Sequence, residues 1–317
     1  MLIATASEAL NNRGRVAATT RARVQQAADE LGYHPDRVAR SLRSGRSRLL
    51  GLALRMFADE PDSYPADAYF ALLISASAAA AMRHGYALAL LPDDPDGGLI
   101  AQLPVDAMLV ADAAEGDPLL DHAFSMGVPV VSDYRPNDPR ALLIVDVDRE
   151  ALVSIVFDHL RERGSRRPGL LGLTDDSLFA RDVETAYRAW CVRCGVAPHV
   201  ARAGELDVSA QEQGAMTLWN QGCDAVFGLA GVSGMTLAAT AQACGLRVPD
   251  DVMIACCAED LRYTQTDPPL TTVSLDPVAV ADASVAMAID AIEKGVPVEQ
   301  RITLVVPRLL ARESTRS

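Results

Sequence analysis

Residues 69–91 read YFALLISASAAAAMRHGYALALL, a stretch of helical length that ends at Gly85 and is followed by a short apolar run. Further short apolar runs, separated by longer amphipathic stretches, stand at 49–54, 107–111 and 128–132. Such runs are typical of buried strands. Their alternation with helices predicts a parallel sheet with helices on both faces.

A second series of the same kind begins with ALLIV at 141–145 and ends with a helix from Pro277 to Lys294. Two series predict two lobes, and we assign all of the second series to the second lobe. In open sheets of this type, ligands bind beyond the carboxyl ends of the strands. We therefore expect a pocket in the cleft between the lobes.

Length and composition fit this architecture. A chain of 317 residues with 50% apolar content can form two lobes and a small appendage. We find neither an apolar run of membrane-spanning length nor the basic start and apolar core of a signal peptide, so we expect a cytoplasmic protein. The cysteines are then expected to be reduced thiols. They stand at 191, 194, 223, 244, 256 and 257.

The net charge of −13 is unevenly distributed along the chain. Residues 1–48 hold nine arginines against four acidic residues, net +5, and the rest holds 20 basic and 38 acidic residues, net −18. A basic arm on an acidic body is typical of a small DNA-contacting module attached to a domain that does not bind DNA. A disordered basic tail is the alternative.

The basic arm contains one clear helix, from Thr19 to Leu31, with apolar residues at 24, 27, 28 and 31 and a stop at Gly32. Pro35 interrupts the chain, and residues 37–43 have the length of about two helical turns. So short a helix is marginal alone in water because nucleation costs more than a few hydrogen bonds return. It needs a partner to form.

Enzyme signatures are absent from the sequence or lack an essential residue. GVSGM at 231–235 has the context of a nucleophile elbow, but Met235 stands where that motif needs glycine. The five histidines are scattered, and no phosphate-binding glycine loop is present. We expect no enzyme, no cofactor and no metal site. A redox pair in CVRC (191–194) and a thiol sensor at Cys256 and Cys257 remain alternatives to plain packing.

Several segments resemble the lactose-repressor/galactose-repressor (LacI/GalR) family of bacterial transcription regulators, in matching order and spacing. They are TASEALN (5–11), TRARVQQAADELGYHPDRVARSLRSGRSRLLGLAL (20–54), GVPVVSDYRP (127–136), LRERGSRRPGLLG (160–172), PPLTTV (268–273) and RLLARESTRS (308–317). The resemblance implies an α/β fold in which a helix-turn-helix headpiece and a hinge helix precede a two-lobed core similar to periplasmic binding proteins. It also implies operator binding as a dimer and a response to small molecules.

Three parts of the chain follow from this resemblance. Residues 1–34 are expected to form a partial helix-turn-helix headpiece, and residues 35–48 the hinge helix and linker. Residues 49–317 are expected to form the core that binds the effector and dimerises.

The resemblance makes Leu2 to Asn11 the recognition helix. It places Ile3, Ala4 and Glu8 against base edges, and Thr5, Ser7, Asn11 and Arg15 against the DNA backbone. Glu8 departs from the family, which commonly has arginine there. A carboxylate can accept from cytosine's amino group but also repels phosphates.

Asp36 to Arg43 resembles the hinge helix, which in the family folds on DNA and inserts a leucine into the minor groove. Leu42 stands at that position, and Arg37, Arg40 and Arg43 can neutralise phosphates. The alternative is an ordinary arginine-rich linker with Leu42 folded onto the core.

For the effector, the resemblance implies that the pocket residues are Tyr69, Phe70, Asp148, Arg181, Tyr187, Ala230 and Glu259. The planar guanidinium of Arg181 suits hydroxyls or carboxylates. The chain has Ala230 and Gly231 where the family usually has an asparagine and aspartate pair, and Ala258 where it usually has an aspartate. The chain therefore lacks some of the polar residues that usually bind sugars in the family.

The leading hypothesis is a ligand-responsive transcription regulator, most often a repressor, that binds a pseudo-palindromic operator as a homodimer and takes a sugar or related metabolite in the cleft. The alternative is a cytoplasmic sensor of the same fold whose headpiece no longer binds DNA. Met1 falls where the family usually has a valine just before the recognition helix, so the first headpiece helix is expected to be missing. We then expect the chain as it stands to bind operator weakly or not at all.

Overall fold

The computed structural model describes residues 16–30, 46–55, 67–92, 98, 100–113, 116–133, 139–140, 143–174, 178–204, 207–297 and 299–316, with the single positions 5 and 9. The chain divides into two compact units, Met1–Arg48 and Leu49–Ser317. Each is described by itself.

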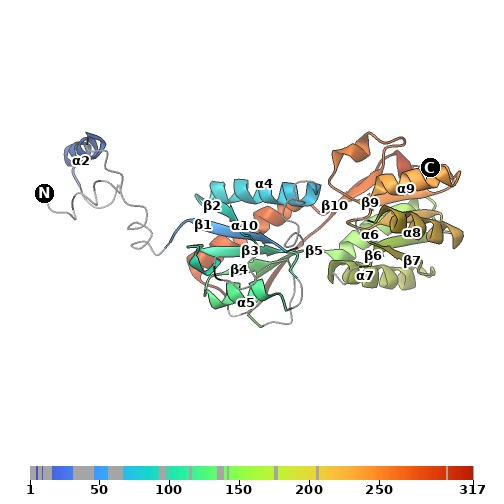
Figure 1. Ribbon diagram of the computed structural model, residues 1–317, viewed down its shortest axis with the longest axis horizontal. Helices are drawn as coiled ribbons and strands as arrows, with labels where there is room; N and C mark the ends of the chain where they lie inside the picture. Colours follow the sequence, from blue (N-terminus) through green and yellow to red (C-terminus); the bar gives the residue numbers. More distant parts are fainter. Residues whose placement is uncertain are drawn as a thin grey trace. The chain divides into compact units, whose positions relative to one another are not determined.

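The N-terminal unit contains α2 (Ala18–Glu30), which Figure 1 labels. Val24 and Ala28 are buried, as their spacing of one helical turn predicts, whereas Ala27 is exposed. Thr5 is helical and half-buried. The other residues predicted to contact DNA, and the predicted hinge helix at 36–43, lie outside the described residues.

The first lobe of the larger unit is built on a six-stranded parallel sheet in the order β11-β5-β4-β3-β1-β2. Its strands are β1 (Leu49–Leu54), β2 (Ala87–Leu90), β3 (Ala107–Ala111), β4 (Val130–Ser132), β5 (Leu143–Val147) and β11 (Arg301–Val305). Its helices are α4 (Ala68–Arg83), α5 (Pro118–Ser125) and α10 (Pro277–Lys294), with a short turn of helix at Ile100–Gln102. The sheet and its helices are seen in Figure 1.

The second lobe has a six-stranded sheet in the order β12-β10-β9-β8-β6-β7, parallel except for the β10-β12 pair. Its strands are β6 (Pro168–Leu173), β7 (Val200–Ala203), β8 (Ala225–Gly228), β9 (Met253–Cys257), β10 (Thr271–Ser274) and β12 (Arg308–Leu310). Its helices are α6 (Arg149–Glu162), α7 (Leu178–Cys194), α8 (Val208–Asn220) and α9 (Gly234–Ala243), with short turns at Leu261–Thr264 and Glu313–Thr315.

The assignment of all of 141–294 to the second lobe is wrong at both ends. Strand β5 joins the first sheet between β4 and β11, and α10 packs against α4 in the first lobe. In the described part of the core, the chain passes between the lobes after β5, after β10 and between β11 and β12. Hydrophobic periodicity reports that a segment is buried but not which sheet buries it.

Acidic and hydroxyl side chains begin many of the helices. Because the first backbone N–H groups of a helix have no partner within it, a side-chain oxygen that accepts from them stabilises the start. Residues that do so are Asp67, Asp117, Asp148, Asp207, Ser233 and Asp276. These caps place the first turns of α4, α6 and α9 at the same edges of the sheets as the strand ends.

The C-terminal segment is tied into the second lobe by a buried hydroxyl network. Ser314 Oγ donates to the carbonyl of Ile254 at 2.6 Å and accepts from the backbone N–H of Thr271 at 2.8 Å. Thr315 Oγ1 lies 2.8 Å from His159 Nε2 on α6. The RESTRS ending therefore links two strands and a helix of this lobe.

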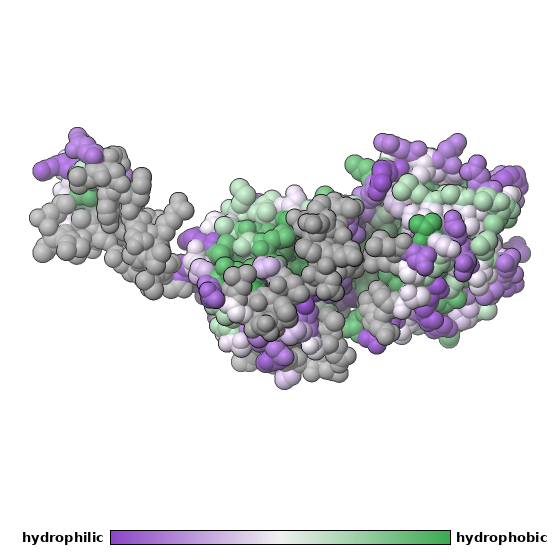
Figure 2. Space-filling model, viewed as in Figure 1, coloured by the Kyte–Doolittle hydropathy of each residue, from purple (hydrophilic) through white to green (hydrophobic). Residues whose placement is uncertain are grey.

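On the face shown in Figure 2, the two lobes differ in polarity. Figure 2 shows apolar residues gathered over α4 and β2 of the first lobe and hydrophilic residues over much of the second. Exposed apolar side chains of α4 and β2 include Leu72, Met82 and Leu90. None of the helices that the structure describes has the length and apolarity needed to cross a bilayer.

Candidate functional site

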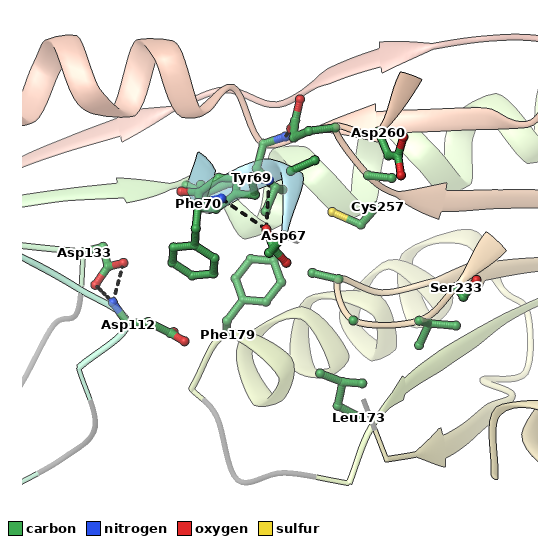
Figure 3. Close-up of a pocket in the computed structure, with 18 of the residues that line it drawn as sticks. Asp67, Tyr69, Phe70, Asp112, Asp133, Leu173, Phe179, Ser233, Cys257 and Asp260 are labelled. Atoms are coloured by element: carbon green, nitrogen blue, oxygen red, sulfur yellow. Dashed lines mark hydrogen bonds between the residues drawn. The ribbon is translucent and has the colours of Figure 1, made fainter. Parts of the chain in front are cut away.

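A cavity of about 840 Å³ lies between the two lobes, at the carboxyl ends of their strands. Its first-lobe side includes Asp67, Tyr69, Phe70, Asp112, Asp133 and Asp146, and its second-lobe side includes Arg149, Phe179, Arg181, Ala230, Cys257 and Glu259. Figure 3 shows these two sides facing each other. The cleft expected from the alternating pattern is present.

Strand ends place two carboxylates together on the first-lobe side. Asp112 directly follows β3 and Asp133 directly follows β4, its neighbour in the sheet. Both oxygens of the Asp133 carboxylate accept from the backbone N–H of Asp112, at 2.8 and 2.9 Å. Asp112 has a left-handed backbone, φ 59°, which aspartate tolerates better than most residues. That turn aims its N–H at Asp133.

The environment of Asp133 favours its protonated form. Burial, the neighbouring carboxylate of Asp112 and the carboxylate of Asp146 favour protonation, and the pKa of Asp133 is raised to about 8. The hydrogen bond from Asp112 N and the guanidinium of Arg149 act in the opposite direction. An opposite charge placed beside Asp133 would return it to the ionised form.

Arg149 joins the two sides of the cavity. Its guanidinium forms an ion pair with Asp146 and donates to the carbonyl of Val147 at 2.8 Å, both at the end of β5. The Cζ atom of this guanidinium lies 5.3 Å from the centre of the Phe179 ring on α7. It therefore links the first lobe to the second at the β5–α6 crossing.

The second-lobe side carries charges in three different situations. Glu259 follows β9, accepts from Leu275 N at 2.7 Å, and has a pKa raised by burial. Asp260 and Arg262 form an ion pair. Arg181, on the first turn of α7, is exposed and has no ion-pair partner among the described residues.

Aromatic rings complete the cavity wall. Tyr69 and Phe70, at the start of α4, lie edge to face with ring centres 5.2 Å apart. The pKa of Tyr69 is raised well above its usual value, first by burial and then by the carboxylates of Asp133, Asp112, Glu259 and Asp146. The phenol is therefore neutral, close to four acidic groups.

The residues predicted from the sequence are only partly brought together. Tyr69, Phe70, Arg181, Ala230 and Glu259 line the cavity. Their roles in binding stay predictions.

Two predicted pocket residues lie elsewhere. Tyr187 is fully buried in the core of the second lobe, packed on Phe157 and Trp190, and its hydroxyl donates to the carbonyl of Pro168 at 2.7 Å. Asp148 caps α6 by accepting from Ala151 N at 2.9 Å. Tyr187 points inward because the apolar face of α7 covers its own sheet, and the carboxylate of Asp148 is used by the helix start.

Sequence reasoning missed many of the side chains that line the cavity, among them Asp112, Asp133, Arg149 and Phe179. One signal could have found the two aspartates, because each directly follows a buried run, at 107–111 and 128–132. Arg149 and Phe179 carry no comparable signal. Their position depends on how α6 and α7 begin.

The cysteines of the proposed redox and sensor sites, and the serine of the GVSGM motif, have packing or capping contacts. Cys257 lines the cavity, and burial raises its pKa, which keeps the thiol protonated and weakly reactive. Cys191 is buried in α7, where burial likewise raises its pKa. Ser233 of GVSGM caps α9, accepting from Thr236 N at 3.2 Å. No group of three potential metal ligands occurs among the residues that the structure describes.

Comparison with known proteins identifies the family. Residues 157–315, half of the chain, match the periplasmic binding protein-like domain, and residues 3–36 match the bacterial regulatory proteins of the lacI family. The chain belongs to the lacI family. Its combination of an N-terminal regulatory segment and a two-lobed core is that of a transcriptional regulator, and the expected fold class is confirmed.

Relatives and solved structures agree with this assignment. The chain is 26% identical over 329 residues to the HTH-type transcriptional repressor CytR of Escherichia coli K12, covering 99% of this chain and 93% of CytR. A lac repressor dimer solved with operator and the anti-inducer ONPF has a TM-score of 0.81 at 20% identity, covering 99% and 95% of the two chains. A CelR–cellobiose complex has a TM-score of 0.75 at 23% identity, covering 97% and 94%. At these identities the structures show a shared fold.

Proposed function

We propose that this lacI-family regulator binds a pseudo-palindromic operator as a homodimer, acts as a repressor in the cytoplasm, and is controlled by a small molecule in the interlobe cavity. The observation that carries the proposal is a lacI-type segment at 3–36 on the same chain as a core with an 840 Å³ cavity at its strand ends. Cavities of a few hundred to about a thousand Å³ suit small-molecule ligands.

On the DNA side, we assign residues 1–34 to the headpiece and 35–48 to the hinge. Nine arginines in this basic arm supply phosphate contacts, which provide most of the affinity and make it depend steeply on salt. Residues 3, 4 and 8 are the proposed base contacts, and Leu42 is the proposed minor-groove wedge. All of these residues precede the core, which begins at Leu49.

On the effector side, the proposed ligand is a sugar or related metabolite. CelR has been solved with cellobiose and the lac repressor with ONPF, which supports a small polar ligand in a core of this fold. Arg181 offers hydrogen-bond donors from the second lobe, and Tyr69 offers an aromatic face from the first. A ligand that contacts both sides favours the closed arrangement of the lobes.

The segments that cross between the lobes would couple ligand binding in the cavity to DNA binding. Asp276 has a left-handed backbone, φ 54°, caps α10, and pairs with Arg308 at 2.9 Å. This ion pair joins the crossing after β10 to the strand that follows the crossing between β11 and β12. A ligand that binds one arrangement of the lobes more tightly shifts the population toward it. In a dimer, that shift changes the spacing of the two hinge helices.

A homodimer would cover apolar surface on the first lobe. The exposed side chains of Leu72, Met82 and Leu90 on α4 and β2 would favour association, since contiguous exposed apolar surface is uncommon on monomers. We assign effector binding and dimerisation to residues 49–317. The relatives found are transcriptional regulators.

Fluorescence anisotropy tests the DNA half of the proposal. The full chain is titrated onto labelled DNA taken from beside its own gene, with scrambled DNA as the control, across a range of salt concentrations. We expect weak binding that prefers this DNA over the scrambled DNA and whose affinity falls steeply with salt. Leu42→Ala should weaken specific binding more than non-specific binding, since a wedge acts only on bent DNA. An equal loss on both DNAs contradicts the wedge, and equal wild-type affinity for both contradicts the operator.

A further inference from the structure

The two lobes present different chemistry to the interlobe cavity at equivalent positions, the carboxyl ends of their strands. In the first lobe, Asp112 directly follows β3 and Asp133 directly follows its neighbour β4. In the second lobe, Leu173 ends β6 and Ala258 directly follows β9. All four residues line the cavity. The strand ends are therefore acidic on one side and apolar on the other.

The apolar residues of the second lobe lie side by side. Strands β9, β8 and β6 are neighbours in the second sheet, so their carboxyl ends meet at one edge. The apolar side chains at this edge form a surface that we call the apolar wall. Its members are Leu173, Ala230, Val232, Cys257 and Ala258. In Figure 3, Leu173 and Cys257 lie at the opposite end of the cavity from Asp112 and Asp133.

Two exposed apolar residues extend this side of the cavity. Val208 begins α8 and Met235 lies in the first turn of α9, and both line the cavity. They are 55% and 36% exposed. Apolar side chains left in contact with water beside an apolar wall favour an apolar group that would cover both.

Charged side chains on the second-lobe side have partners or contact water. Asp260 and Arg262 form an ion pair, and Glu259 accepts from the backbone N–H of Leu275 at 2.7 Å. Arg181 is exposed to solvent. Because each of these charges is already paired, hydrogen-bonded or hydrated, none requires a charged ligand to neutralise it.

The buried amide on this side is also engaged within the lobe. Gln211 Nε2 donates to the carbonyl of Gly231 at 3.1 Å, and its Oε1 accepts from the backbone N–H of Ser233 at 2.9 Å. These bonds hold the loop between β8 and α9 against α8. The amide therefore shapes the second-lobe side instead of presenting its polar atoms to a ligand.

The opposite end of the cavity suits uncharged hydroxyl groups. Burial and the carboxylates of Asp112 and Asp146 favour protonation of Asp133, whose pKa is about 8, so most of this carboxyl is uncharged at neutral pH. The phenol of Tyr69 is neutral as well, because its pKa is raised. An uncharged carboxyl group and a phenol both donate and accept hydrogen bonds, as a ligand hydroxyl does.

We propose that the ligand is a hydroxylated molecule with an apolar substituent of aryl size, as in an aryl glycoside, oriented with its hydroxyls toward Asp112 and Asp133 and its substituent on the apolar wall. This class and orientation rest on the proposed function of the cavity. The volume of about 840 Å³ lies in the upper part of the range for small-molecule pockets, which leaves room for a sugar ring and a second ring. The second ring adds affinity by leaving water.

The test uses the full chain and two pairs of probes that differ only in the substituent. They are phenyl against methyl β-D-glucopyranoside, and phenyl against methyl β-D-galactopyranoside, with phenol alone as a further probe. Affinity is measured by calorimetry at several temperatures. In at least one pair we expect the phenyl glycoside to bind about tenfold or more tightly than the methyl glycoside, with a more negative heat-capacity change.

Two variants place an amide on the second-lobe side. Ala258→Asn alters the apolar wall, and Met235→Gln replaces an exposed thioether with a polar chain of similar length. Each should lower the phenyl-to-methyl affinity ratio by about threefold or more. The matched control is Met216→Gln, on α8 and away from the cavity lining, where the residue is 37% exposed. It should keep the ratio.

A variant at the other end tests the orientation. Asp133→Ala should weaken both glycosides of the responding pair by the same factor, about threefold or more, and leave their ratio unchanged. A ratio that changes in Asp133→Ala but not in Ala258→Asn overturns the inference. It is also overturned by equal binding of phenyl and methyl glycosides, by no binding of either phenyl glycoside at millimolar concentration, or by phenol that binds as tightly as the phenyl glycosides.

These outcomes are separable from those of the proposed function. A methyl glycoside that binds as tightly as its phenyl counterpart and releases operator DNA supports the proposed regulation and overturns the apolar substituent. A phenyl glycoside that binds selectively and leaves operator binding unchanged supports the ligand class and contradicts the regulatory role of the cavity.

Discussion

Replacing Arg149 with methionine tests whether the ion pair at the β5–α6 crossing holds the two lobes together. The side chains of Arg149 and Asp146 are only 14% and 6% exposed. Methionine keeps the apolar stem but leaves the buried carboxylate of Asp146 without this cation. It also removes the hydrogen bond to the Val147 carbonyl and the contact with the Phe179 ring.

The expected cost follows from the burial of the pair. Removing one partner of a fully buried ion pair costs about 3–5 kcal/mol. Asp146 still accepts from Val147 N at 2.7 Å, which moderates the penalty. We therefore expect Arg149→Met to lower the free energy of unfolding by about 2–4 kcal/mol. The cavity should lose ligand affinity as well, since its two sides are no longer tied.

Urea unfolding followed by circular dichroism measures this loss. The matched control is Arg83→Met, which breaks an ion pair with Asp282 whose side chains are 59% and 50% exposed. Such a pair contributes about 1 kcal/mol or less. In the double variant with Asp146→Asn, the combined cost should fall short of the sum by at least about 1 kcal/mol. Equal losses in Arg149→Met and the control, or strict additivity, would refute the reasoning.

Further predictions address ligand response, pH and packing. Arg181→Ala should abolish effector-induced release of operator while leaving operator binding intact, and release at the wild-type ligand concentration in a gel-shift assay contradicts its assignment to the cavity. Burial lowers the pKa of His159, so unfolding takes up a proton there as pH falls below about 6.5. The stability that His159 contributes is therefore present at neutral pH and lost in acid, and His159→Gln should flatten the fall in urea midpoint between pH 7 and 5. A Cβ at Gly234 would lie 2.6 Å from Cys256 Sγ, so Gly234→Ala should cost about 1–3 kcal/mol, whereas Gly172→Ala, which meets no atom within 4 Å, should cost far less in the same urea assay.

Local patterns anticipated much of the fold. The spacing of Val24 and Ala28 predicted their burial on α2, and the short apolar runs at 49–54, 107–111 and 128–132 are strands of one parallel sheet. The cleft followed from the rule that parallel strands present their carboxyl ends to ligands. These inferences succeed because burial periodicity and strand direction are properties of neighbouring residues.

Site residues were harder to place than the fold. Tyr69 and Phe70 line the cavity, but Tyr187, an aromatic residue on a helix that contributes to the same wall, packs wholly into the core. The difference is which face of the helix each side chain occupies, and an amphipathic pattern cannot tell a core-facing ring from a cavity-facing one. Asp148 shows a second limit, because its carboxylate is engaged by the start of α6.

The amino-acid sequence by itself determined the class of fold, the two lobes, the basic arm and the position of the cleft. Only the tertiary structure decided that β5 and α10 belong to the first lobe, and that Asp112, Asp133 and Arg149 meet in the cavity. Those residues meet because chain crossings and helix starts bring together segments that are distant in sequence. Contacts between such distant segments depend on how whole helices and strands pack together. Local sequence patterns do not encode that packing.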